Sequence, residues 1–135
     1  MKIEWNEDLA VGVEKIDEQH KELFNRFNHL LEACSAGSGS KEIGSLLCFL
    51  DEYVRVHFSD EEKLQVAHSY PDYPLHREQH RIFINKLDEF KKEMLTEGAT
   101  LSLTIATNRM MIDWLLNHIA QMDKKIGEFI NQKKC

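Results

Sequence analysis

The chain has 135 residues, 42% of them hydrophobic and 30% charged, a composition typical of a single globular domain over residues 1–135 and not of a disordered chain. Its formal net charge is -6 at pH 7, and no cluster of Lys and Arg offsets it, which excludes nucleic acid as a partner. The first residues contain no apolar run, so we expect no signal peptide, no membrane span and a cytoplasmic location.

Three breaks divide the chain into four long helical segments. A Ser/Gly turn occupies residues 35–40, two prolines interrupt residues 69–74, and Gly98 with Thr100 can end one helix and cap the next. Between the breaks, apolar residues recur at the spacing of amphipathic helices, with Asp17 as the expected N-cap of the first helix. The predicted helices run over about residues 17–34, 41–66, 75–95 and 101–122, and Ile105 begins the expected buried stripe of the last one.

Segments of this length with short links predict an all-α fold, an antiparallel up-down-up-down four-helix bundle. Residues 1–16 form an N-terminal arm packed across the bundle, which spans residues 17–122. The C-terminal tail, residues 123–135, has enough apolar residues for a short amphipathic helix over one end. In this topology the starts of the first and third helices lie beside the ends of the second and fourth.

Side chains that can bind metal gather at that shared end. The histidines and Glu61 stand where the periodicity of each helix calls for an apolar residue, and such a residue is costly to bury unless it is paired. Asp123 follows His118 by five residues, roughly 140° around an ideal helix, so it must reach the others from a frayed end or a local bulge. A shared metal partner explains the whole set. Its members are His20, His57, Glu61, His76, His80, His118 and Asp123.

Seven ligands without a cysteine are too many for one tetrahedral zinc ion. If both carboxylates and one solvent oxygen bridge two ions, the five imidazoles divide as three and two, which gives one six-coordinate and one five-coordinate ion. An imidazole-rich site with oxygen ligands suits iron, and the open position suits a small exogenous molecule. The metalloprotease pattern H-E-x-x-H does not fit residues 76–80, because Glu78 stands one position too late, and the Glu-x-x-His pattern of ferritin-like proteins is also absent.

Several motifs resemble the hemerythrin family in its bacterial form, over about residues 4–130. They are Val11-Gly12-Val13, Ile16 to His20, His57 to Glu62, Tyr70-Pro71, His76 to His80 and Trp114 to Asp123. The resemblance implies two iron ions (Fe2+/Fe3+) with an oxo or hydroxo bridge, which bind dioxygen reversibly. It also assigns the ligands: His76, His80 and His118 to the saturated iron, His20 and His57 to the open iron, and Glu61 and Asp123 as bridges to both.

The resemblance further implies a dry, apolar pocket beside the open iron. Ordinary core packing is fully compatible with the candidate residues and, for each of them taken singly, is favoured over a specific gating role. They are Leu23, Phe24, Phe58, Trp114, Leu115 and Ile119. The chain departs from the family pattern at Ser69, where a glycine often precedes Tyr-Pro, and at Gln65, where methionine is common. A glutamine there can admit water or donate a hydrogen bond to a bound ligand, and our hypothesis is that Gln65 shortens the life of the oxygenated form.

Three functions stay open at this point. The first, favoured because one bare domain carries all seven ligands, is dioxygen storage, delivery or buffering by a protein that is not an enzyme. The second is an oxygen, redox or iron sensing module. The third is a di-iron oxidase, peroxidase or nitric oxide scavenger, although the sequence shows no spare acid or base at the site. We expect a monomer whose partners are dioxygen and an unidentified reductant or oxygen-consuming protein.

The other cysteines and histidines receive no functional role. The three cysteines are an odd number without close pairing, which fits a reducing compartment. Cys34 and Cys48 stand among apolar residues and are expected to serve as small hydrophobes, and Cys135 ends the chain. His29 and His68 do not share the spacing of the ligand set and are expected on the surface or in loops.

Overall fold

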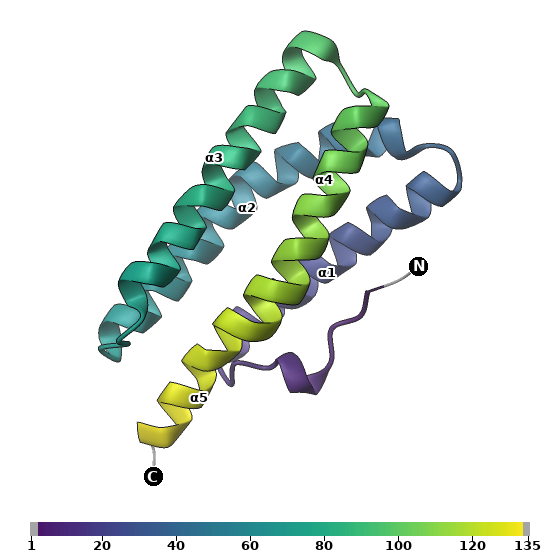
Figure 1. Cartoon of the computed structure of the whole chain (residues 1–135). Coiled ribbons are helices and arrows are strands. Elements are labelled where there is room, and N and C mark those ends of the chain that lie inside the picture. Colours follow the sequence, from purple (N-terminus) through teal and green to yellow (C-terminus); the bar gives the residue numbers. More distant parts are fainter. Residues whose placement is uncertain (1–2, 134–135) are drawn as a thin grey trace.

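The computed structural model describes residues 3–133, so Cys135 lies outside it. A short 3-10 turn, η1 (Glu7–Leu9), precedes four long antiparallel helices (Figure 1). They are α1 (Glu14–Ser35), α2 (Gly39–Ala67), α3 (Tyr73–Glu97) and a last helix that runs through α4 (Leu101–Asp113), η2 (Trp114–Asp123) and α5 (Lys124–Lys133). The predicted antiparallel four-helix bundle is confirmed.

The link between α3 and α4 has the predicted capping residues. Gly98 ends α3 with a φ of 78°, a left-handed conformation that glycine adopts without a steric penalty. The hydroxyl of Thr100 accepts a hydrogen bond from the backbone N–H of Leu103 at 3.1 Å, which caps the first turn of α4. Both ends of this link are therefore fixed by local chemistry.

The predicted N-cap of α1 is wrong. The helix begins at Glu14, and Asp17 lies inside its first turn. The Asp17 carboxylate instead accepts hydrogen bonds from the backbone N–H of Val11 at 2.7 Å and of Gly12 at 3.3 Å. Asp17 therefore holds the N-terminal arm against α1.

The arm and α5 close one end of the bundle together. Gly127 of α5 packs so closely on the arm that a Cβ at this position would clash with the backbone carbonyl of Val11. A small apolar cluster joins the arm, the beginning of α1, the link between α2 and α3, and α5. Its buried members are Val11, Ile16, Tyr70, Ile126 and Ile130.

The opposite half of the bundle, called here the apolar half, is packed with hydrophobic side chains. Its most buried members are Phe27, Leu30, Ile43, Leu47, Leu50 and Leu103. Two sequence expectations fail in this region. Ile105, predicted in the buried stripe of the fourth helix, is 44% exposed, and Cys48 is exposed, whereas Cys34 is half-buried against the core.

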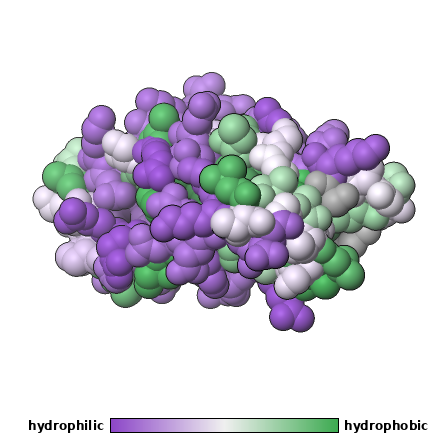
Figure 2. Space-filling model, turned by 90° about the horizontal axis from the view of Figure 1, so that it is seen from above, coloured by the Kyte–Doolittle hydropathy of each residue, from purple (hydrophilic) through white to green (hydrophobic). Residues whose placement is uncertain are grey.

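The surface is mostly hydrophilic on the face seen in Figure 2, where hydrophobic side chains form separate groups. Among the described residues, none of the helices combines the length and the apolar character that a membrane crossing would require.

Candidate metal centre

All seven side chains of the predicted ligand set lie buried at the end of the bundle that the arm and α5 cover. They come from α1, α2, α3 and η2, and none is more than 4% exposed. The structure brings together His20, His57, Glu61, His76, His80, His118 and Asp123. His29 and His68 lie outside this cluster.

Asp123 reaches the cluster because the last helix changes its winding after α4. From Trp114 to Asp123 the segment is a π-helix, and the α-helix resumes at Lys124. A π-helix closes its hydrogen bonds between residues five apart, so it brings His118 and Asp123 to the same face, which an α-helix would not do. The local bulge expected from the i, i+5 spacing is confirmed, in the form of this π-helical segment.

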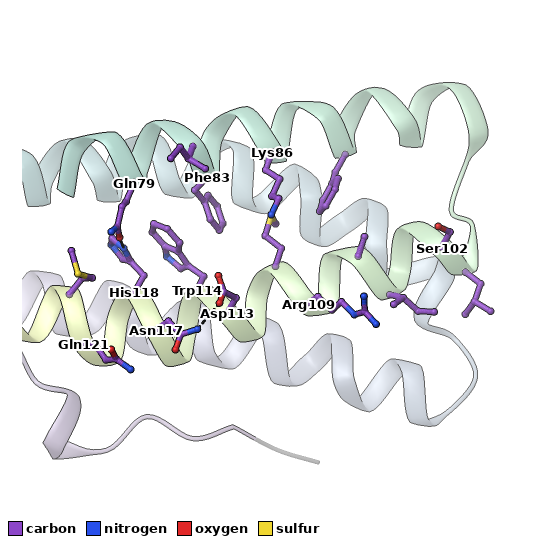
Figure 3. A pocket seen from close by; sticks show the side chains of 17 residues that line it. Gln79, Phe83, Lys86, Ser102, Arg109, Asp113, Trp114, Asn117, His118 and Gln121 are labelled. Carbon is purple, nitrogen blue, oxygen red and sulfur yellow. Dashed lines mark hydrogen bonds between the residues drawn. The ribbon is translucent and has the colours of Figure 1, made fainter. Parts of the chain in front are cut away.

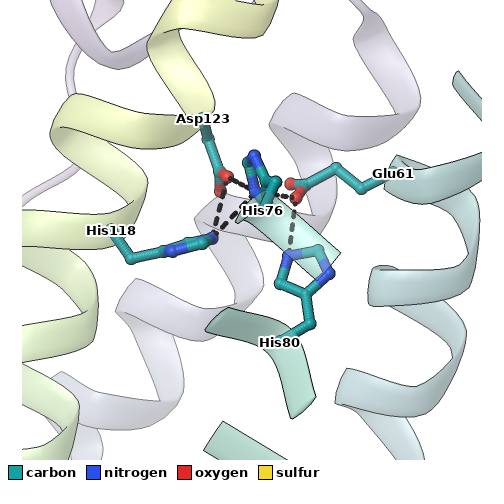
Figure 4. Close-up of side chains that lie close together, drawn as sticks. All are labelled: Glu61, His76, His80, His118 and Asp123. Atoms are coloured by element: carbon teal, nitrogen blue, oxygen red, sulfur yellow. Dashed lines mark hydrogen bonds and ion pairs between the residues drawn. The ribbon is translucent and has the colours of Figure 1, made fainter. Parts of the chain in front are cut away.

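The carboxylate of Glu61 faces two different pairs of imidazoles. Its Oε1 lies 3.1 Å from Nε2 of His76 and 3.1 Å from Nε2 of His80 (Figure 4). Its Oε2 lies 3.2 Å from Nε2 of His20 and 3.2 Å from Nε2 of His57. One side chain therefore contributes one oxygen to each of two groups of ring nitrogens.

The carboxylate of Asp123 is divided in the same way. Its Oδ1 lies 2.7 Å from Nε2 of His76 and 3.0 Å from Nε2 of His118, and dashed lines in Figure 4 mark these two contacts. Its Oδ2 lies 3.0 Å from Nε2 of His20. The site thus contains a three-imidazole set, with His76, His80 and His118, and a two-imidazole set, with His20 and His57. Each set includes an oxygen from both carboxylates.

The donor atoms of each set converge on a common point. Within each set, the ligand atoms all lie within 4.8 Å of each other. The Nε2 atoms of His76 and His118 lie 3.0 Å apart. The two oxygens of Asp123 and Nε2 of His57 lie 2.7 to 3.2 Å from their neighbours, but none of these contacts has the geometry of a hydrogen bond. Buried polar atoms are rarely left unpaired, so the arrangement fits donors that surround metal ions.

Two glutamines bind histidines of the predicted ligand set at Nδ1, the ring nitrogen that does not face the cluster. Oε1 of Gln19 accepts a hydrogen bond from Nδ1 of His57 at 2.7 Å, and Oε1 of Gln79 accepts one from Nδ1 of His118 at 2.8 Å. A proton on Nδ1 leaves Nε2 as a lone-pair donor to metal. This role was not predicted from the sequence. Its signal was the repeated Glu-Gln-His at residues 18–20 and 78–80, in which each glutamine reaches the histidine of a neighbouring helix.

The other three imidazoles differ in the hydrogen-bond partner of Nδ1. Nδ1 of His80 donates to Oε2 of Glu62 at 3.0 Å, a second role that sequence analysis missed. The Nδ1 atoms of His20 and His76 are buried and have no hydrogen-bond partner among the described side chains and backbone groups. The Nδ1 atoms of the five rings therefore differ in their partners: two face a neutral amide, one faces a carboxylate, and two have no partner among the described residues.

The carboxylates and imidazoles shift each other's protonation. Burial alone would lower the pKa of His20, but the carboxylates of Asp123 and Glu61 raise it to about 10. The same opposition raises the pKa of His76 to about 9. Burial would raise the pKa of Glu61, yet the neighbouring imidazoles, first that of His57, hold it well below its usual range, and the pKa of Asp123 is lowered likewise. A metal cation takes the place of these protons, so its binding releases them.

The six residues expected to line an apolar pocket are all buried in the main hydrophobic core. The indole of Trp114 stacks on the ring of His118 at 3.7 Å between centroids, and the ring of Phe58 stacks on His80 at 3.9 Å. A pocket role for the six stays a prediction. They are Leu23, Phe24, Phe58, Trp114, Leu115 and Ile119.

Gln65 follows Glu61 by one turn of α2, whereas Phe58 precedes Glu61 by about one turn. Its side chain is 0% exposed, and neither amide atom has a hydrogen-bond partner among the described residues. The expected effect of Gln65 on the oxygenated form stays a prediction.

A groove between α3 and the last helix leads to the three-imidazole set. Its volume is about 1200 Å³, and Figure 3 shows Trp114, His118 and Gln79 pointing into it. Ile82 and Ile105 form part of its apolar wall, which explains why Ile105 is not in the core.

Comparisons with known proteins agree with this geometry. The family described as Hemerythrin HHE cation binding domain matches residues 11–130. The chain is 33% identical to a bacteriohemerythrin of Methylococcus capsulatus, over 89% of each chain. It is 31% identical to a myohemerythrin of Theromyzon tessulatum, over 90% of this chain and 88% of the relative. A crystal structure of a hemerythrin point mutant superposes with a TM-score of 0.80 at 29% identity, covering 95% of this chain and 96% of that one. The chain belongs to the hemerythrin family.

Proposed function

We propose that this chain binds dioxygen reversibly at a non-haem di-iron centre and serves oxygen storage, delivery or buffering. The observation that carries the proposal is the division of both carboxylates, Glu61 and Asp123, between two sets of imidazoles. Such a division suits two metal ions bridged by the same two side chains. When bound, two Fe2+ ions supply the two electrons that dioxygen takes up and returns.

The donor count leaves one position for an exogenous molecule. The three-imidazole set offers three nitrogens and two carboxylate oxygens, and the two-imidazole set offers two nitrogens and two oxygens. One bridging oxygen from solvent would raise these totals to six and five. We therefore assign His76, His80 and His118 to the saturated iron and His20 and His57 to the open one.

The surrounding residues keep the site dry and fix its donors. Buried apolar side chains, among them Leu23, Phe24 and Ile119, exclude water that would displace a bound small molecule. Gln19 and Gln79 keep a proton on Nδ1 of His57 and His118, which directs Nε2 of both rings to the metal. We place Leu115 and Trp114 in the same lining, on the turn of η2 before His118.

The partners beyond dioxygen follow from this chemistry. An oxidised centre needs an electron donor to return to the Fe2+ state, so we propose an unidentified reductant as a second partner. We further propose that the protein acts as a cytoplasmic monomer, and that it is not an enzyme.

The optical spectrum of the iron-loaded, anaerobically reduced protein tests the function. Dioxygen is added and then removed while the spectrum is recorded. We expect a coloured oxygenated species that disappears when dioxygen is removed and returns when it is added again. Direct and irreversible conversion to the oxidised form would contradict the proposal and indicate oxidase or peroxide chemistry.

A further inference from the structure

The carboxamide of Gln65 is a buried polar group that the proposed metal chemistry does not use. It is 0% exposed, and both Oε1 and Nε2 lack a hydrogen-bond partner among the described residues. A buried amide without partners is strongly unfavourable, so native structures usually satisfy such a group with an internal water. Gln65 stands one helical turn after Glu61, and because both side chains are fully buried they share one face of α2.

The register of α2 and α3 places Gln65 opposite the turn that carries His76. Glu62 contacts Arg77 at 4.0 Å and Nδ1 of His80 at 3.0 Å, so residue 62 of α2 faces residues 77–80 of the antiparallel α3. Gln65 is three residues further along α2 and therefore faces the start of α3. His76 lies there, in the first turn.

The other imidazole with an unpaired Nδ1, His20, lies at a different level. Asp60 contacts Gln19 at 2.9 Å and Lys15 at 3.3 Å, so residue 60 of α2 faces residues 15–19 of the antiparallel α1. Gln65 is five residues further along and therefore faces the first residues of α1 and the end of the arm, before the level of His20. His76 is therefore the unpaired imidazole at the level of Gln65.

We propose that Gln65 is a positioning residue for His76 and acts through one internal water that both side chains bind. The water accepts a hydrogen bond from Nδ1–H of His76 and donates one to Oε1 of Gln65, and Nε2–H of Gln65 is a further donor to it. Together these atoms give the two to four partners that an internal water requires. The proposal rests on the proposed function, because it takes Nε2 of His76 as an iron ligand.

This assignment makes Gln65 the third glutamine behind a ligand-set histidine. Gln19 and Gln79 contact their histidines directly, at 2.7 Å and 2.8 Å, whereas Gln65 uses water. All three offer a neutral acceptor, so Glu62, behind His80, is the one charged acceptor among these contacts. The water fixes the ring plane of His76 and thereby the direction of its Nε2.

The exchange of imidazole N–H protons in the iron-loaded, reduced protein tests the proposal. With histidine labelled by ¹⁵N, Gln65→Leu should accelerate the exchange of one N–H proton at least about tenfold and shift its resonance. Gln65→Glu, which keeps an acceptor, should restore slow exchange. Gln79→Leu is the matched control, because it removes a direct bond and should alter a different resonance, that of His118.

Iron release to a chelator gives a second readout. Loss of a group that orients a ligand typically weakens metal binding by about 10 to 100-fold, so Gln65→Leu should release iron about tenfold faster than the wild type. Val66→Ala, at an exposed neighbour, should leave the rate unchanged. Unchanged exchange and release in Gln65→Leu would overturn the proposal.

A high-resolution crystal structure of the wild type separates this proposal from the proposed function. We expect a water within hydrogen-bond distance of Gln65 and of Nδ1 of His76, with or without iron. If no water lies within hydrogen-bond distance of Gln65, the inference is overturned, whereas the proposed function is still decided by the optical test of dioxygen binding. Failure of wild-type protein to bind dioxygen reversibly, with this water present, would overturn the function alone.

Discussion

The same four helices bury apolar side chains at one end and ionisable ones at the other. In the apolar half, residues such as Phe27, Leu47 and Leu50 are at most 2% exposed and fill the space between helices. In the half that carries the cluster, called here the metal half, equally buried positions hold five imidazoles and two carboxylates. The two halves therefore have different tasks. Hydrophobic burial in the apolar half stabilises the bundle, whereas the buried polar groups of the metal half lower its stability but place the donor atoms.

The largest effect is expected from the side chain that serves both irons. Glu61→Ala removes one donor from each set and leaves a cavity between four imidazoles, so bound iron should fall from two ions per chain to fewer than one. Metal analysis of the purified, reconstituted variant measures this. Glu128→Ala, at an exposed glutamate, should keep two irons. Retention of two irons by Glu61→Ala would refute the bridging role.

A smaller loss is expected when one set alone is damaged. His57→Ala takes one of two imidazoles from the open iron, so this ion should be lost or weakly held while the other stays bound. Iron content and the optical spectrum report the change. The exposed His29 provides the histidine control, and His29→Ala should match the wild type. The prediction fails if two irons remain with an unchanged spectrum.

Damage to the apolar half should lower stability and spare the metal. Leu50→Ala deletes a fully buried side chain and should reduce the free energy of unfolding by about 2 to 5 kcal/mol. Chemical denaturation measures this value, and iron content should stay at two. Leu95→Ala, at a position 87% exposed, should change stability by less than about 0.5 kcal/mol. Loss of iron in a folded Leu50→Ala protein would show that the halves are not separate.

The two halves should also differ in their response to pH. Because the pKa of His20 is raised to about 10 and that of His76 to about 9, their stabilisation of metal-free protein is complete below about pH 6.5, the pKa of unfolded histidine, and is lost as pH rises to 10. The lowered pKa values of Glu61 and Asp123 act in the opposite direction, so their stabilisation is lost as pH falls below about 4.

Thermal unfolding of the metal-free protein measures this dependence. The melting temperature should be highest between about pH 4.5 and 6.5 and should fall by about 5 °C or more toward pH 9. Leu50→Ala should lower the whole curve without changing its shape. A metal-free protein that becomes more stable between pH 7 and 9 would contradict the charge pairing.

The smallest effect is expected from the residues that accept a hydrogen bond from Nδ1 of a ligand histidine. Gln79→Leu leaves Nδ1 of His118 without its acceptor, so iron release to a chelator should accelerate by about tenfold, with two irons still bound initially. Gln121→Leu, at an exposed glutamine of the same groove, is the control. Equal release rates in both variants would show that Gln79 does not support the centre.

Much of the bundle follows from the sequence because its signals are local or topological. Apolar periodicity and the breaks at Gly98 and Pro71 predict the helices, and antiparallel order then places four helix ends together. The spacing of His118 and Asp123 even predicts an irregular helix, since no regular α-helix presents both to one point. Each of these features follows from the periodicity and the breaks of the chain itself.

The missing parts depend on contacts between helices. Asp17 looks like an N-cap by type, but in the fold its carboxylate binds the arm at Val11. Ile105 fits the apolar stripe, yet it faces a groove because α3 and α4 do not close over it. The support of His57 by Gln19 requires the exact register of α1 and α2, which side-chain spacing along one helix does not contain.

Anomalous diffraction at the iron absorption edge, from crystals of the iron-loaded protein, tests the central claim most directly. We predict two iron peaks per chain in the metal half, one contacted by His76, His80 and His118 and the other by His20 and His57, with Glu61 and Asp123 contacting both. A single peak, or two peaks that do not share both carboxylates, would contradict the account.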